Sequence, residues 1–203
     1  MAIEMSSPWI AGPVGAAAGA VLAWIATEYK TRKTYRNVIL LLAKSADDFA
    51  GMGQVEKALS IYDQILQDLP RLEPAVRGEV RFRQGLGYYG QSFEGARETN
   101  LRRAVEAFEE ASGLLKAEKN PVEHAQAKNS LGMSLLRLSE VGGERSLEAA
   151  EGGWRDEMEQ NLKRAIGAFE EALKLYSAEA RAQERSQTEN NLGDAYLLLS
   201  RIE

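Results

Sequence analysis

Two stretches of this sequence recur together, and their recurrence restricts the chain to a repeat architecture. The segment NLRRAVEAFEEA at residues 100–111 returns as NLKRAIGAFEEA at 161–172. At the same spacing, QAKNSLG at 126–132 returns as QTENNLG at 187–193. The chain is rich in alanine, leucine, glutamate and arginine, which favour helices, and runs of β-branched residues are nearly absent. The sequence therefore predicts an all-α array of amphipathic hairpins, each burying its apolar stripe against the next.

The small, aromatic and proline positions of these hairpins resemble those of the tetratricopeptide repeat family. The first unit matches with Leu42, Ala46 and Phe49 in one helix and with Ala58, Tyr62, Ile65 and Pro70 in the next. The second has Leu86-Gly87 with Ala104, Phe108 and Ala111, and the third has Leu131-Gly132 with Ala165, Phe169 and Ala172. A last helix, with Leu192-Gly193, Ala195 and Tyr196, begins a fourth unit.

The resemblance implies a tetratricopeptide-like α-solenoid over residues 30–203. Its units are expected at about 36–70, 72–117 and 121–177, followed by a terminal helix at 180–201. In this family the first helices of successive repeats line a groove that binds other proteins. The positions that the resemblance assigns to a partner groove are Arg81, Gln84, Tyr88, Gln126, Asn129, Met133, Gln187, Asn190 and Asp194. The matching positions of the first unit, Leu40, Ala43 and Asp47, lack the lysines and asparagines with which related domains hold the acidic tails of chaperones.

A long loop is predicted at 139–160, where Gly142-Gly143 and Gly152-Gly153 interrupt the helical pattern. It contains an isolated tryptophan, Trp154. Two interpretations stay open, a flexible surface loop and a loop that contacts a partner through Trp154.

The N-terminal region predicts a transmembrane anchor at residues 1–29. No charged residue occurs from Ser6 to Thr27, which is long enough for a helix to cross the hydrocarbon core. Trp9 and Trp24 lie near its ends, and basic residues follow it, so the C-terminal domain is expected on the cytoplasmic or plastid stromal side. A cleaved signal peptide and a buried helix of a soluble protein are the alternatives. Small residues recur every fourth position and predict packing against other membrane helices: Ala11, Gly15, Gly19 and Ala23.

The composition argues against several chemistries. The chain has no cysteine and a single histidine, His124, which disfavours thiolate sites and histidine-rich metal sites. The net charge of −5 gives no general attraction to nucleic acid. No catalytic constellation and no phosphate-binding loop is found, so neither an enzyme activity nor a cofactor, metal or small-molecule substrate is expected.

The sequence thus predicts a non-catalytic, membrane-anchored scaffold for protein–protein interaction, an assembly factor or accessory subunit of a membrane protein complex. Membrane subunits would meet the N-terminal helix, and a soluble protein or peptide would meet the groove. The layout is similar to that of tetratricopeptide proteins that assist photosystem assembly. The alternatives are a soluble peptide-binding adaptor and a regulatory module that acts on an enzyme in trans.

Overall fold

The computed structural model describes residues 32–68, 73–146, 154–176 and 181–202, and these contain seven helices and no strand. The helices are α2 (Arg32–Gly51), α3 (Val55–Asp68), α4 (Pro74–Gln91), α5 (Arg97–Leu114), α6 (Pro121–Ser146), α7 (Trp154–Leu175) and α8 (Ala182–Ile202). Prolines stand at the first position of α4 and of α6, where a missing N–H costs nothing. The prediction of an all-α fold is confirmed.

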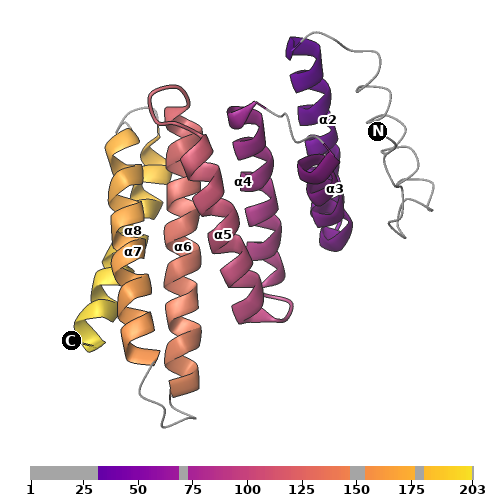
Figure 1. The fold of residues 1–203 in the computed structure, drawn as a ribbon. Helices are drawn as coiled ribbons and strands as arrows, with labels where there is room; N and C mark the ends of the chain where they lie inside the picture. The colour runs from indigo at the N-terminus through magenta and orange to yellow at the C-terminus, as the bar shows by residue number, and fades with distance from the viewer. Residues whose placement is uncertain (1–31, 69–72, 147–153, 177–180, 203) are drawn as a thin grey trace.

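The helices pack in chain order, and each contacts the next (Figure 1). The even-numbered helices also contact one another in succession, α2 with α4, α4 with α6 and α6 with α8. Helices α4 and α5 lie within the second expected unit and α6 and α7 within the third, whereas α2 begins at Arg32, before the expected start of the first unit. Helix α8 overlaps the expected terminal helix. The even helices therefore form one continuous layer, and residues far apart in sequence share its face.

Two glycine–phenylalanine contacts hold the α4–α5 and α6–α7 pairs together. Phe108 of α5 lies on Gly85, where an added Cβ would be 2.7 Å from its Cε1 atom. Phe169 of α7 lies on Gly132 in the same way, with a corresponding distance of 2.5 Å. Both phenylalanines are fully buried. The bare glycine backbone lets the ring approach the neighbouring helix more closely than any side chain would allow.

The prediction of a long loop at 139–160 is wrong, because most of these residues are helical. Helix α6 continues through Gly142-Gly143 to Ser146, and α7 begins at Trp154. Each helical glycine costs about 1 kcal/mol, but Leu138 and Val141 are buried against Leu101 and offset that cost. Tertiary packing therefore overrides the local glycine signal. Trp154 is half-buried and packs against the core that α5 to α8 share.

The predicted membrane anchor lies outside the described residues, as do Ala11, Gly15, Gly19 and Ala23. Over the described parts of the chain, none of the helices has an apolar stretch that is long enough to cross a membrane.

Alkaline pH is expected to destabilise the fold through Tyr176, which is 3% exposed. Burial, with a smaller contribution from Glu184, raises the pKa of Tyr176 to about 12. Because this folded-state pKa exceeds the ordinary value of 10.0, the contribution is intact below about pH 10 and is lost as the pH rises towards about 12. Urea unfolding from about pH 9 to about pH 12 should show this fall in stability. Tyr176→Phe should make the fall shallower, and an unchanged slope would contradict the assignment.

Candidate functional site

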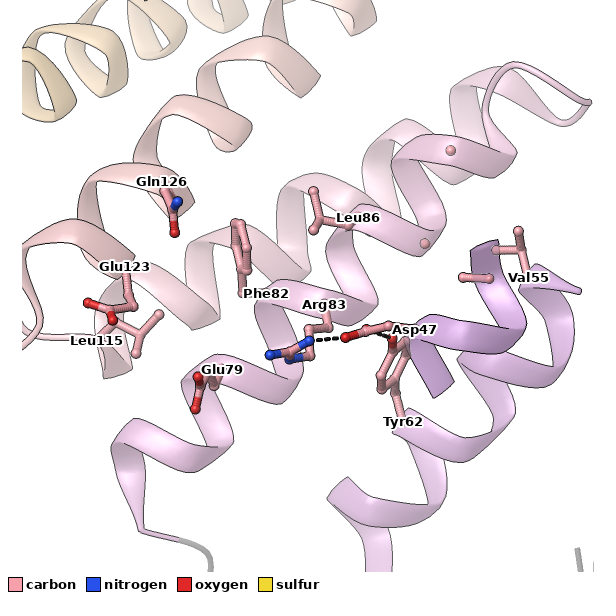
Figure 2. A pocket seen from close by; sticks show the side chains of 13 residues that line it. Asp47, Val55, Tyr62, Glu79, Phe82, Arg83, Leu86, Leu115, Glu123 and Gln126 are labelled. Carbon is pink, nitrogen blue, oxygen red and sulfur yellow. Dashed lines mark hydrogen bonds and ion pairs between the residues drawn. The ribbon is translucent and has the colours of Figure 1, made fainter. Parts of the chain in front are cut away.

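A cavity of about 470 Å³ lies on the face shared by the even helices (Figure 2). Helices α2, α4 and α6 supply most of its wall, with further residues from α3 and with Leu115, which directly follows α5. Its lining residues are Asp47, Ala50, Val55, Tyr62, Glu79, Phe82, Arg83, Leu86, Gly87, Gly90, Leu115, Glu123 and Gln126. We call it the α2–α4–α6 groove.

Asp47 links three helices at one end of this groove. Its carboxylate accepts a hydrogen bond from the Tyr62 hydroxyl of α3 and pairs with the Arg83 guanidinium of α4. Figure 2 shows both contacts converging on Asp47. Burial, and then the bond to Asp47, raise the pKa of Tyr62 well above its usual range. Tyr62 therefore stays a neutral donor, and the cluster fixes α2 against α4.

Replacing Asp47 with alanine should lower the free energy of unfolding by about 1–2 kcal/mol, because a buried hydroxyl and a partly buried guanidinium lose their acceptor. The matched control is Asp48→Ala, since Asp48 is the exposed neighbour on the same helix. Urea denaturation followed by circular dichroism measures both variants. Equal stability of the two variants would contradict a structural role for this cluster.

The floor of the groove is apolar and its edges are acidic. Phe82 packs on the buried Phe108 ring, with centroids 5.7 Å apart, so its position is fixed from below. Leu86, one turn further on, keeps 46% of its surface exposed. Glu79 and Glu123 contribute carboxylates from α4 and α6, whereas the Arg83 charge is paired with Asp47. The groove therefore offers an apolar seat beside negative charge.

Three of the residues predicted to line a partner groove do not line the α2–α4–α6 groove. Arg81, Gln84 and Tyr88 face α3 and α5, where they line a second, polar hollow of about 420 Å³. Gln84 is 1% exposed and donates to Asp63 Oδ1 at 2.6 Å. Arg81 pairs with Glu110 at 2.7 Å, and Arg103 lies 5.7 Å from the centre of the Tyr88 ring. These side chains join α4 to its neighbours.

Arg81, Gln84 and Tyr88 face α3 and α5 because the register of α4 against its neighbours differs by two residues from the register that the sequence pattern predicts. The Leu-Gly pattern of the sequence pairs Gly87 with Gly132, but the glycine in contact with Phe108 is Gly85, and Gly87 faces Leu59 of α3. With Gly85 aligned to Gly132, the α4 counterparts of Gln126, Asn129 and Met133 become Glu79, Phe82 and Leu86. All three line the groove.

A signal for this register was present in the sequence. Aligning Gly85 with Gly132 also matches Tyr88-Tyr89 with Leu135-Leu136, two adjacent large residues after the glycine. The alternative register aligns the same two tyrosines with Met133 and Ser134. Because α4 carries closely spaced glycines at 85, 87 and 90, the glycine positions alone did not decide which of them aligns with Gly132.

The predicted residues of α6 and α8 lie on the layer of even helices, but only Gln126 lines the groove. Asn129 instead accepts a hydrogen bond from Thr188 Oγ1 at 3.0 Å, which joins α6 to α8. Met133 is partly buried against the core. The remaining three predicted residues, Gln187, Asn190 and Asp194, are exposed on α8.

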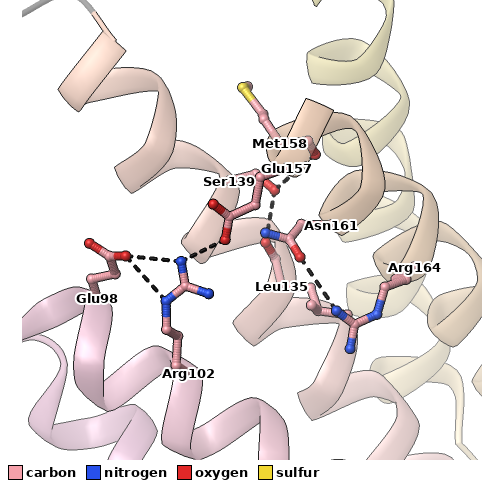
Figure 3. Close-up of polar contacts among 8 residues, drawn as sticks. All are labelled: Glu98, Arg102, Leu135, Ser139, Glu157, Met158, Asn161 and Arg164. Carbon is pink, nitrogen blue, oxygen red and sulfur yellow. Dashed lines mark hydrogen bonds and ion pairs between the residues drawn. The ribbon is translucent and has the colours of Figure 1, made fainter. Parts of the chain in front are cut away.

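Polar contacts between hairpins extend this packing (Figure 3). Arg102 of α5 pairs with Glu98 on its own helix at 3.0 Å and with Glu157 of α7 at 2.6 Å. Ser139 of α6 donates to Leu135 O at 3.0 Å and lies 3.5 Å from Met158 O. The Arg102–Glu157 pair joins α5 to α7, and the Ser139 hydroxyl links α6 to α7.

No cluster of three acidic or histidine side chains that could hold a metal ion occurs in the described part of the chain. His124 Nδ1 lies 2.5 Å from the carbonyl oxygen of Leu115, so the imidazole is engaged with the turn before α6.

A comparison with models of protein families gave no matching family, and a comparison with curated proteins gave no significant match.

Proposed function

We propose that this chain is a non-catalytic scaffold, organised as a tetratricopeptide-like α-solenoid, that binds a protein partner in the α2–α4–α6 groove. The observation that carries the proposal is the apolar seat of Phe82 and Leu86, bordered by Glu79 and Glu123. Leu86 is a large apolar side chain held about half exposed within a concave surface. Such seats are typical of sites that accept an apolar side chain from a partner.

The repeat assignment draws support from the internal sequence repetition and from the shared packing of the hairpins. Gly85 with Phe108 and Gly132 with Phe169 are equivalent contacts in successive pairs. The even helices follow one another in a layer, as the inner helices of a solenoid do.

The charges in the groove suggest the chemistry of the partner. An apolar side chain would enter beside Leu86, and basic side chains would face Glu79 and Glu123. The partner segment is therefore a peptide or helix with an apolar anchor flanked by lysine or arginine. A pair of exposed charges adds little energy, so the anchor carries most of the affinity.

We further propose that the uncharged segment from Ser6 to Thr27 anchors the chain in a membrane, where its small-residue stripe docks against other membrane helices. The scaffold then acts as an assembly factor or accessory subunit of a membrane protein complex.

Purification of the tagged chain from its native host tests both parts. Membranes are washed with alkaline carbonate and solubilised in mild detergent, and co-purified proteins are identified by mass spectrometry. We expect the chain to survive the wash and to bring down integral subunits that the Gly15→Leu/Gly19→Leu double variant loses. Leu86→Glu should lose a soluble partner, whereas Leu41→Glu, at an exposed residue outside the groove lining, should keep it. A chain that washes off, yet binds its partner through Leu86, would be a soluble adaptor instead.

A further inference from the structure

Helix α8 presents a face whose counterpart on α6 is covered by another helix. The repeat at 126–132 and 187–193 aligns Gly132 with Gly193, and the following residues Leu135 and Leu136 with Tyr196 and Leu197. On α6, Leu135 and Leu136 are 0% and 6% exposed, within the core that contains Phe169. On α8, Tyr196 and Leu197 are 49% and 52% exposed. We call Glu189, Leu192, Gly193, Tyr196 and Leu197 the α8 face.

Gly193 is open where its counterparts are filled. A Cβ added at Gly85 or Gly132 would collide with the ring of a phenylalanine from the next helix. A Cβ added at Gly193 would meet no atom within 4 Å. The chain therefore shows twice what covers this kind of glycine, namely an aromatic side chain on a packed helix.

The charge beside the glycine identifies the partner further. The residue four positions before the glycine is Arg81 on α4, before Gly85, and Lys128 on α6, before Gly132. Each pairs with a glutamate two residues after the covering phenylalanine, Arg81 with Glu110 at 2.7 Å and Lys128 with Glu171 at 2.8 Å. On α8 this position is Glu189, whose charge is reversed.

Glu189 contacts Arg185 of its own helix at 2.9 Å, and half of its side chain is exposed. A helix that covered α8 as α5 covers α4 would bring its own side chain to this carboxylate. A glutamate at that place would be repelled, and a lysine or arginine would be attracted.

We propose that the α8 face docks an amphipathic helix of a partner protein. That helix places an aromatic side chain on Gly193 and a lysine or arginine, two residues later, beside Glu189. A second copy of this chain fits poorly, because Phe108 and Phe169 are fully buried and are followed by Glu110 and Glu171. The α8 face lies outside the groove lining, so this site stands independently of the proposed function.

A charge-swap experiment tests the proposal with a peptide made from this chain. The probe is a fluorescently labelled peptide of residues 154–176 that carries Glu171→Lys, titrated with the full chain in mild detergent. It should bind about 3- to 10-fold more tightly than the unchanged peptide, as reversal of one exposed charge pair allows. On the Glu189→Lys chain the preference should reverse. A peptide that also carries Phe169→Ala should lose most of its binding.

Gly193→Leu is the blocking variant. The space at Gly193 is open, so the variant chain can fold without a collision, and the leucine side chain occupies the position of the partner's aromatic ring. This variant should bind the probe peptide at least about tenfold more weakly, and the circular dichroism spectrum of the chain should stay unchanged. Leu86→Glu should leave probe binding unchanged, which separates this site from the groove.

Three results would overturn the proposal. The first is an affinity that does not respond to Gly193→Leu. The second is a preference for the unchanged peptide, which would mean that it displaces α7 from Lys128. The third is self-association of the chain that Gly193→Leu abolishes, since the occupant would then be a second copy.

Discussion

Replacing Phe169 with alanine is expected to lower the free energy of unfolding by about 3–5 kcal/mol, the usual cost of emptying a buried phenylalanine site. The ring is 0% exposed and lies against Gly132 of the preceding helix. Its removal leaves a cavity between α6 and α7 that two rigid helices cannot close. Urea denaturation followed by the helical circular dichroism signal measures the loss.

The matched control is Phe93→Ala, because Phe93 is 68% exposed. It should change the stability by less than about 1 kcal/mol, since little surface leaves water when this ring folds. Similar losses for the two variants would contradict the packing described for the α6–α7 pair.

The second large effect is a difference in sign between two glycines that the repeat makes equivalent. Gly132→Ala should destabilise the chain by about 1–3 kcal/mol, because its Cβ would lie 2.5 Å from the buried Phe169 ring. Gly193→Ala should stabilise it by about 0.5–1 kcal/mol, because the site is open and alanine favours the helix.

A double variant checks the cause of the Gly132 effect. In the Phe169→Ala background, Gly132→Ala should cost much less, because the ring that its Cβ would strike is absent. An equal cost in both backgrounds would mean that the glycine serves some need other than contact with Phe169.

The sequence predicted the helices well because their apolar positions repeat. The two copies of the repeated segment at 100–111 and 161–172, which include Phe108 and Phe169, marked the helices α5 and α7. The buried alanines Ala104 and Ala165 mark the same contact surface in both. Periodicity of this kind survives without knowledge of the neighbours, since it reflects the burial of one helix face.

The end of α6 and the residues of the groove were predicted less well than the helices, because both depend on contacts between helices. Gly142 and Gly143 carry no local sign that Leu138 and Val141 would bury and hold α6 together. The register of α4 depended on which glycine meets the Phe108 ring, a contact between two helices. Tertiary contacts decided both, and local propensity is a weak guide to them.

The polar cluster at the end of the groove also could not be predicted from the sequence. Asp47, Tyr62 and Arg83 come from three helices, and only the packing of α2, α3 and α4 brings them together. From the sequence, Asp47 stands out only because the tetratricopeptide domains that hold chaperone tails have a different residue type at the corresponding position. Its role is to orient the wall of the groove.

Site-specific photo-crosslinking in the native host tests whether a protein partner binds in the α2–α4–α6 groove. A photoreactive phenylalanine analogue replaces Leu86 in the groove, and separately Leu41, an exposed leucine of α2 outside the groove lining. We expect a discrete protein adduct from position 86 and none from position 41. Adducts of equal strength from both positions, or from position 41 alone, would contradict binding in the α2–α4–α6 groove.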